Sequence, residues 1–388
     1  MAPFKLTTWN VEHAADTLAR LEGTARPKRG QSVAEMQALA SAKVEAIAAE
    51  IAEVDPDILF VCEGPPGEER ALRYFALAAP GYDLVQHGDP TGKAYAIKGR
   101  QWLWFLVKKG FPAAVSLLPV PTWQAFTRDQ SGGLTDKGKW QVSMPALDKA
   151  TGTPLPHTLS AHGHYRHPQV ACFDWQGTRV EIIGLHLKSK FVNQRDPRKR
   201  WQKPASGSPA DIRASIEAST GFMVEAVRAR AKLTTEVFDV RNYIERRFGQ
   251  EASPAIFVMG DVNDGPGKEL IETWFMLHDL IGNLQGDVFF ARQFLNHALF
   301  DTEDRLRWSV FFEDAVDPRR DPHILLDHIL FTQRLSGGDA APLRVLPGAG
   351  RVEHDIHERV ASLLPAGITT SDHRPVSVTV TPTAPRVG

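Results

Sequence analysis

The apolar residues of this chain fall into short runs and spaced patterns that predict most of its strands. The continuous apolar run at 58–62 is typical of a strand buried on both faces, because it lacks alternating polar residues. Largely apolar segments at 180–185 and 255–259 predict two more strands. Runs rich in β-branched and aromatic residues predict further strands at 4–9, 102–107, 323–331 and 376–380.

Helical spacing of apolar residues occurs in three segments. The first begins at Ser32 and Glu35, which together form a capping box, and it ends before Pro56, where the residue ahead of a proline disfavours helix. The second helix is predicted at 68–79. The third is predicted at 209–248, with a proline at its first position.

Three other segments lack a clear period. Residues 14–30 are polar and basic, so we expect an exposed loop there, and 189–210 are loop-like and basic as well. Residues 110–165 mix Pro, Gly and Thr with short apolar pieces, which indicates edge strands and loops. Strands alternate irregularly with helices, a pattern typical of a layered α/β or α+β domain with central sheets.

Composition indicates a folded chain and sets few limits on its partners. The 388 residues are 43% hydrophobic and 23% charged, and the formal net charge is −1, so any site for a polyanion must be a local patch. Two cysteines cannot form a disulfide framework. No signal peptide or transmembrane stretch is evident, so we expect a cytoplasmic protein, with a secreted form whose signal was removed as the alternative.

Polar residues follow the apolar runs at five places. The five signatures are Trp9-Asn10-Val11-Glu12, Val61-Cys62-Glu63, Leu185-His186-Leu187-Lys188-Ser189, Gly260-Asp261-Val262-Asn263 and Ser371-Asp372-His373-Arg374-Pro375. Their Asn, Glu, Asp and His side chains are the types that bind a hard metal ion and contact a phosphate.

Each signature taken alone has an ordinary structural interpretation. Asn10 could cap a turn, and Glu63 could be a surface charge where a strand leaves the core. Asp261 and Asn263 could close a strand with an Asx turn. The adjacent acid and imidazole of Asp372 and His373 form the sharpest single element. The five together are explained best by one site on loops beyond a rigid sheet.

The order and placement of the five signatures resemble the endonuclease/exonuclease/phosphatase superfamily, whose fold is DNase I-like. The resemblance spans residues 5–380. It implies a four-layered α/β sandwich, in which two mostly antiparallel β-sheets pack face to face with helices outside. It also implies a single domain over 1–388, with insertions at 13–40 and 190–250 relative to a minimal member.

The same resemblance implies a role for each residue of the site. Residues that hold the metal, directly or through water, would be Asn10, Glu12, Glu63 and Asp372. Residues that act on the water and phosphate would be His186, Asp261, Asn263, Asp327 and His373. Asp261 would orient or deprotonate the attacking water, and Asp327 would keep His373 charged. The implied cofactor is Mg²⁺, with Mn²⁺ as a substitute.

The five signatures do not specify which phosphate ester is the substrate. The extended motif His-Leu-Lys-Ser-Lys resembles bacterial nucleases of the superfamily, and the basic loop after it predicts contacts to a nucleic-acid backbone. The expected substrate-binding residues are Lys188, Lys190, Arg198, Lys199 and Arg200. We therefore expect an endonuclease acting on DNA. A phosphatase or sphingomyelinase-like phosphodiesterase is the first alternative, and a catalytically inactive binding module is the second.

Two features of the sequence lie outside the five signatures. Many members carry an Arg, Tyr or acidic residue between the second and third signatures, and Arg100 is our candidate for it. Four histidines, His157, His162, His164 and His167, form a second cluster. Their spacing matches no strong zinc pattern, so we expect a polar loop.

Overall fold

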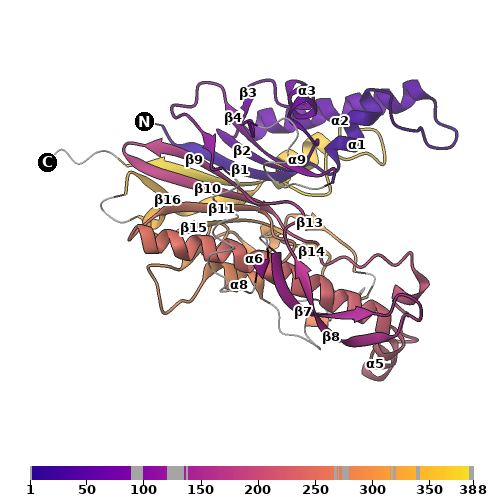
Figure 1. Ribbon diagram of the computed structural model, residues 1–388. Coiled ribbons are helices and arrows are strands. Elements are labelled where there is room, and N and C mark those ends of the chain that lie inside the picture. Colours follow the sequence, from indigo (N-terminus) through magenta and orange to yellow (C-terminus); the bar gives the residue numbers. More distant parts are fainter. Residues whose placement is uncertain are drawn as a thin grey trace.

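Two six-stranded sheets face each other at the centre of the molecule (Figure 1). The computed structural model describes residues 2–88, 99–119, 135–136, 139–265, 269, 271–272, 279–314, 316–317, 320–337 and 341–383. In the first sheet the strand order is β16 (Leu343–Val352), β17 (Val376–Pro382), β1 (Phe4–Asn10), β2 (Ile58–Gly64), β4 (Trp102–Lys108) and β3 (Tyr82–Leu84).

The second sheet repeats the mixed pattern of the first. Its strand order is β12 (Leu295–His297), β15 (Asp327–Thr332), β11 (Ala255–Asp261), β10 (Thr178–His186), β9 (Gln169–Trp175) and β5 (Ser116–Leu117). Smaller sheets pair β13 (Val310–Phe311) with β14 (His323–Ile324), and β6 (Thr135–Asp136) with β7 (Lys139–Leu147) and β8 (Pro154–His162).

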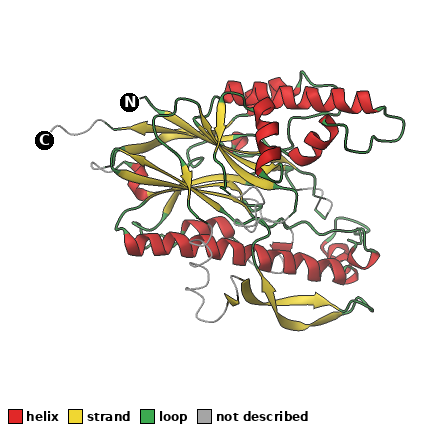
Figure 2. Cartoon of the chain, turned by 45° about the horizontal axis from the view of Figure 1, so that its top comes forward, coloured by secondary structure: helices red, strands yellow, loops and turns green. Residues whose placement is uncertain are grey.

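Helices cover the outer face of each sheet (Figure 2). The helices are α1 (Ala14–Leu21), α2 (Val33–Val54), α3 (Glu68–Ala78), α5 (Pro209–Ala218), α6 (Thr220–Gln250), α8 (Leu280–Gln285) and α9 (His354–Ala361), with short 3-10 turns at Pro197–Lys199, Asp304–Leu306 and Gln333–Ser336. Helices α1, α2 and α3 share one apolar cluster with the first sheet, and α6 and α8 share another with the second. The expected four-layered α/β sandwich is therefore confirmed.

Each sheet contains one parallel pair of strands, and its other pairs are antiparallel. Strand β1 runs parallel to β2, with Asn10 opposite Cys62, and β10 runs parallel to β11, with His186 opposite Asp261. Parallel strands end at the same edge of a sheet, and an apolar core that includes Phe60, Ile182 and Phe257 holds the two sheets together. The polar residues that follow all four strands are thereby directed to one end of the sandwich.

One predicted loop is wrong and one predicted helix is interrupted. Residues 14–30 begin with α1, because Ala14, Thr17 and Leu18 lie on one face at helical spacing and are buried against α2. The many arginines and lysines nearby conceal this short apolar stripe in the sequence. The helix predicted at 209–248 is divided at Ser219 into α5 and α6.

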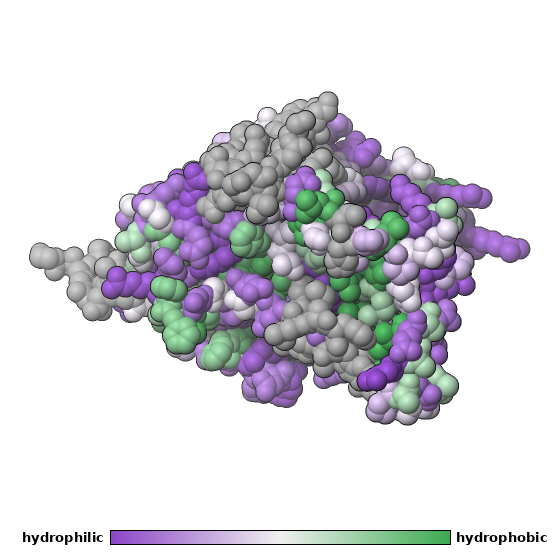
Figure 3. Space-filling view, turned by 60° about the horizontal axis from the view of Figure 1, so that its bottom comes forward, coloured by the Kyte–Doolittle hydropathy of each residue, from purple (hydrophilic) through white to green (hydrophobic). Residues whose placement is uncertain are grey.

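The surface toward the viewer in Figure 3 is a mosaic of hydrophilic and hydrophobic residues. Several large apolar side chains are exposed, of which Phe289 is the most open at 92%. None of the helices within the described ranges has both the length and the apolar character that crossing a bilayer would require.

The core between the sheets predicts the cost of truncating its aromatic side chains. Phe60 is fully buried and contacts Phe105 with ring centroids 4.8 Å apart. Phe60→Ala should lower the free energy of unfolding by about 3–5 kcal/mol, because it removes apolar contacts and leaves a cavity. The exposed Phe289 is the matched control, and Phe289→Ala should stay within about 0.5 kcal/mol of the wild type in urea denaturation. Equal losses in the two variants would contradict this assignment of the core.

Candidate active site

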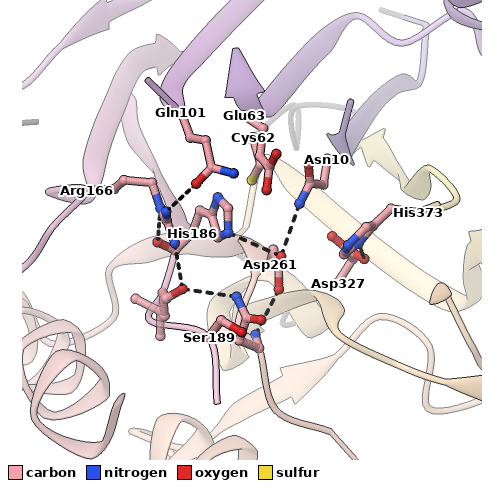
Figure 4. A network of polar contacts seen from close by, with 12 residues as sticks. Asn10, Cys62, Glu63, Gln101, Arg166, His186, Ser189, Asp261, Asp327 and His373 are labelled. Atoms are coloured by element: carbon pink, nitrogen blue, oxygen red, sulfur yellow. Dashed lines mark hydrogen bonds and ion pairs between the residues drawn. The ribbon is translucent and has the colours of Figure 1, made fainter. Parts of the chain in front are cut away.

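Asp261 is the centre of a polar network between the two sheets (Figure 4). Its Oδ2 accepts a hydrogen bond from Asn10 Nδ2 at 3.2 Å and lies 3.4 Å from His186 Nε2. Asn10 ends β1 in the first sheet, whereas His186 and Asp261 end adjacent strands of the second. The three signatures therefore meet across the interface between the sheets.

Strands β10 and β11 approach each other closely just before Asp261, and this fixes the position of Asp261 beside His186. At the preceding residue, Gly260, a Cβ atom would lie 1.9 Å from the carbonyl oxygen of Leu185 on β10. Gly260 also has a φ of +138°, a conformation that other residues rarely adopt. The glycine of the fourth signature is thus required by packing, and it brings Asp261 next to His186.

Asp327 and His373 form a buried ion pair beside Asp261. His373 Nδ1 donates to Asp327 Oδ2 at 2.6 Å, and Ser309 Oγ donates to the same oxygen at 2.8 Å. Asp327 lies opposite Asp261 in the pairing of β11 with β15, so both side chains project from the same face of the sheet. The segment that carries His373 is tied to β1 by the indole of Trp9, which donates to the His373 carbonyl at 2.9 Å.

Burial and neighbouring charges set the protonation of these groups. Burial raises the pKa of Asp261 to about 7, and the Asp327 carboxylate contributes to the rise. Burial opposes the charged form of His373, but the Asp327 carboxylate outweighs it and raises the pKa of His373 to about 10. Burial lowers the pKa of His186 well below its ordinary value, and the nearby Arg166 guanidinium adds to this effect. Near neutral pH the site therefore contains one charged and one neutral imidazole.

Glu63 lies in a strained stretch of backbone at the end of β2, the strand next to the one that carries Asn10. Its φ is 61°, at the point where the register between β2 and β4 breaks. Burial favours the neutral carboxyl, but hydrogen bonds from His13 lower the pKa of Glu63, and the positive charge of the His13 imidazole adds to this effect. Six described residues other than glycine have such positive φ values, and three of them line the cleft: His13, Glu63 and Asn263. Strain of this kind is typical of functional sites.

The remaining signature residues have different positions relative to the cleft. Asn263 is on the wall, where its side-chain amide donates to the Leu187 carbonyl at 3.0 Å. Asp372 is also on the wall and its side chain is 58% exposed. Glu12 pairs with Lys43 at 3.2 Å and is not among the residues that line the cleft.

Arg166 is the site residue that the sequence did not reveal. Its guanidinium donates to the carbonyl oxygens of His186 and Leu187 at 3.1 and 3.0 Å and to Gln101 at 2.8 Å. No carboxylate of the described residues pairs with it, so its charge faces the cleft. Arg100, our candidate for this position, instead pairs with Asp16 on the surface. Arg166 follows the histidine-rich segment, and no local motif distinguishes it.

The basic loop after His186 is largely neutralised by acidic neighbours. Lys190 contacts three carboxylates, those of Asp264 at 2.8 Å, Glu272 at 2.9 Å and Glu269 at 3.3 Å. Lys188 and Lys190 line the cleft. The other three expected substrate-binding residues lie outside it: Arg198 pairs with Asp196, Lys199 pairs with Glu225, and Arg200 donates to the Gln194 carbonyl.

The described part of the histidine cluster is largely buried, and the expected polar loop holds for two of its three members: His164 and His167 lie in the loop between β8 and β9, whereas His162 is in a strand. His162 ends β8 and lies 3.0 Å from Glu236, and His164 lies 3.0 Å from Asp239. These carboxylates are one turn apart on α6, so the pairs fasten the β7–β8 hairpin to that helix. Glu236 also accepts the Lys188 backbone N–H at 2.7 Å, which links this network to the cleft. The side chain of His157 lies outside the described residues.

The site residues line one cleft with a volume of about 1140 Å³, namely Asn10, His13, Glu63, Arg166, His186, Asp261, Asn263, Asp372 and His373. One part of its wall is polar and carries the catalytic candidates. The other part is apolar and includes Phe222, Val310, Phe312, Ile324 and Leu326. The cleft therefore offers a charged centre next to an apolar surface.

A family model for the endonuclease/exonuclease/phosphatase family matches residues 7–373 of this chain. The chain belongs to this family. The predicted membership is therefore confirmed over nearly the whole sequence. Enzymes of the three kinds in the family name hydrolyse phosphate esters, so the chain is a hydrolase of this family.

Several solved structures are similar to this chain over nearly its whole length, at low sequence identity. A truncated TDP2 from Caenorhabditis elegans has 11% identity and a TM-score of 0.46, with 98% of each chain covered. D. rerio TDP2 complexed with a single-strand DNA product has 13% identity and a TM-score of 0.46, covering 98% of this chain and 100% of that one. The mannosyl-6-phosphatase Bt3783 from Bacteroides thetaiotaomicron has 13% identity and a TM-score of 0.45, covering 97% and 99%. No curated protein sequence matches the chain significantly.

The donor groups fit the divalent metal that members of this family use. Ligand atoms of Asp261, Asp327 and His373 lie within 4.8 Å of one another, and Asp327 Oδ1 is buried without a hydrogen-bond partner among the described residues. His373 is protonated at neutral pH and its Nδ1 is committed to Asp327, so it is a poor ligand. Glu63, which follows the strand next to Asn10, supplies a further charged carboxylate. The site is rich in oxygen donors, as Mg²⁺ and Mn²⁺ require.

Removal of the Asp327 charge should lower the pKa of His373. In Asp327→Asn the imidazole keeps a hydrogen-bond acceptor but loses the anion that raises its pKa to about 10. NMR titration should therefore find His373 deprotonating at a markedly lower pH than in the wild type. The exposed His323, which pairs with Asp321 away from the site, should give the same ring resonances in both proteins at a fixed pH.

The same pair predicts how stability depends on pH. The folded-state pKa of His373 lies above its ordinary value of 6.5, so the ion pair stabilises the fold fully below that pH. The contribution is lost as the pH rises toward 10. The stability difference between wild type and Asp327→Asn should shrink over that range in denaturation experiments, and a constant difference would contradict the assignment.

Proposed function

We propose that this protein hydrolyses phosphodiesters by in-line attack of water, assisted by Mg²⁺ or Mn²⁺. The observation that carries the proposal is the convergence of Asn10, His186 and the Asp327–His373 pair around Asp261, with Glu63 beside Asn10 on the wall of the same cleft. These groups come from both sheets. A buried carboxylate can act as a base, a charged and a neutral imidazole can contact the phosphate, and oxygen donors can hold a metal ion. Together they supply the groups that hydrolysis of a phosphate ester uses.

Glu63 is the residue that would hold the metal, with Asn10 and Asp372 beside it, as the family pattern implies. When bound, a divalent cation polarises the phosphate and neutralises charge that develops on its oxygens. Glu63 suits this role because its lowered pKa keeps it ionised, and its position near the cleft gives it access to substrate. Glu12, the fourth metal residue that the family pattern implies, points toward Lys43.

Asp261 is our candidate for the general base. Its pKa near 7 matches the pH at which a carboxylate both accepts a proton readily and is largely ionised. Asn10 and the Asn263 backbone N–H, which donates to Asp261 Oδ1 at 2.9 Å, hold the carboxylate in one orientation. A water beside it can then be oriented and deprotonated as it attacks phosphorus.

The two imidazoles and Arg166 would stabilise the phosphate. His373 is charged and its Nε2 is available to donate, because Nδ1 is held by Asp327. His186 is neutral, and its Nε2 faces Asp261 at 3.4 Å. Arg166 adds a buried positive charge without a carboxylate partner in the described part of the chain. Fixed donors of this kind stabilise the charge that develops on the non-bridging oxygens.

We infer that the substrate is a nucleic acid and favour endonuclease action on DNA. Lys188 and Arg166 offer positive charge on the cleft wall. Exposed aromatic side chains stand on the same wall, namely Tyr165, Phe191 and Phe312. Bases stack on such side chains while basic residues contact the backbone.

One observation favours a second candidate, a phosphatase or phosphodiesterase acting on a small phosphate ester. A long polyanion needs several free cations along its path, and Lys190 and Arg198 are already paired with carboxylates. A small substrate needs only the charges near the reacting phosphate. The two candidates differ in substrate length and share the chemistry.

Hydrolysis should depend on both the metal and the Asp261 carboxylate. EDTA should abolish turnover, and added Mg²⁺ or Mn²⁺ should restore it. Asp261→Asn should reduce kcat by about 10² to 10⁴, because the amide keeps its shape but cannot accept the proton. Circular dichroism should show an unchanged fold. Full activity in chelator, or in this variant, would refute the mechanism.

A substrate panel with Mg²⁺ should decide between the two candidates. Plasmid DNA, single-stranded DNA, RNA, inositol phosphates and sphingomyelin would each be tested at matched enzyme concentration. The nuclease proposal expects kcat/KM to be highest for DNA and to fall steeply as salt increases. Preference for a small ester, with little salt dependence, would favour the second candidate and exclude the first.

A further inference from the structure

His13 contacts Glu63 through both its backbone and its side chain. The backbone N–H of His13 donates to Glu63 Oε2 at 2.9 Å, and its ring Nδ1 lies 3.0 Å from the same oxygen. Both residues have left-handed backbones, with φ values of 55° and 61°. The strained backbone at two distant points of the sequence thus holds one imidazole nitrogen against one carboxylate oxygen at the cleft.

The neighbouring Gln101 contacts the same imidazole nitrogen. Arg166 Nη1 donates to Gln101 Oε1 at 2.8 Å, and this turns the Gln101 amide nitrogen toward His13 Nδ1, at 3.3 Å. His13 Nδ1 and Glu63 Oε2 are close enough to share one proton. A divalent cation that displaces this proton would be bound by a lone pair from each atom.

The distance between the two atoms matches adjacent ligands of one metal ion. In octahedral coordination with bonds of about 2.1 Å, neighbouring ligand atoms lie about 3.0 Å apart. His13 Nδ1 and Glu63 Oε2 have this separation. Glu12, which precedes His13, also has a left-handed backbone and pairs with Lys43 instead. Glu12 and His13 are thus two successive residues with left-handed backbones. As a result, the imidazole of His13 faces Glu63, and the carboxylate of Glu12 does not.

We propose that His13 is a metal ligand alongside Glu63, and that it shifts the preference of the site from Mg²⁺ toward a transition-metal ion such as Mn²⁺. An imidazole nitrogen binds Mn²⁺ and later divalent metals of the first transition row better than it binds Mg²⁺, which prefers oxygen. This inference rests on the proposed function, because it requires a divalent cation at Glu63.

Mn²⁺ bound to the full-length protein without substrate provides a test that does not depend on activity. Pulsed EPR detects coupling between Mn²⁺ and a coordinated ¹⁴N nucleus. The wild type should show this coupling, and His13→Ala should lose it. His323→Ala is the control, because His323 Nδ1 lies 2.9 Å from Asp321 in another histidine–carboxylate pair away from the cleft, and it should retain the coupling.

Calorimetric titration of the same proteins measures the metal preference. The ratio of the Mg²⁺ to the Mn²⁺ dissociation constant should fall by about tenfold or more in His13→Ala, chiefly because Mn²⁺ binds less tightly. His13→Gln, which offers an oxygen donor of similar reach, should bind Mg²⁺ at least as tightly as the wild type but should lack the nitrogen coupling. It also provides a second variant if the alanine variant folds poorly.

Two other outcomes would overturn the inference and would be distinguishable from each other. If Mn²⁺ binds the wild type without nitrogen coupling, or if the coupling persists in His13→Ala, His13 is not a ligand and the proposed function is unaffected. If neither Mg²⁺ nor Mn²⁺ binds the wild type, the metal-dependent function fails together with the inference.

Discussion

The arrangement of the whole site depends on one constraint, the face-to-face packing of two sheets that each contain a parallel pair of strands. Parallel pairing brings Asn10 and Glu63 to one edge of the first sheet and His186 and Asp261 to one edge of the second. The apolar core then holds these edges together. A shift of one residue in either pair would turn its polar side chain toward the opposite face.

Charge burial at this edge is costly, and the surrounding structure offsets much of the cost. Asp261, Asp327 and His373 are each less than 10% exposed, and they are stabilised by one ion pair and several fixed donors. Burial raises the pKa of Asp261, and the adjacent Asp327 carboxylate raises the pKa of His373. The interactions that make these groups tolerable inside the protein therefore also give them the protonation states that hydrolysis needs.

Runs of basic residues in the sequence did not predict which positive side chains carry uncompensated charge in the cleft. The loop after His186 has many lysines and arginines, yet Lys190 is surrounded by acids that lie more than 70 residues away along the chain. Conversely, Arg166 comes from a segment without a basic run, and no carboxylate in the described ranges pairs with it. A positive side chain contributes to substrate binding only if the folded neighbours leave its charge uncompensated.

The sequence by itself determined the strands that carry the site and the Asn, Glu, His and Asp residues at their ends, because buried strands require apolar runs and polar residues must leave the core. It also indicated the family. Only the tertiary structure decided that α1 forms, that His13 rather than Glu12 faces Glu63, and that Arg166 points into the cleft. These outcomes depend on contacts between residues far apart in the sequence and on backbone conformations that no local pattern specifies.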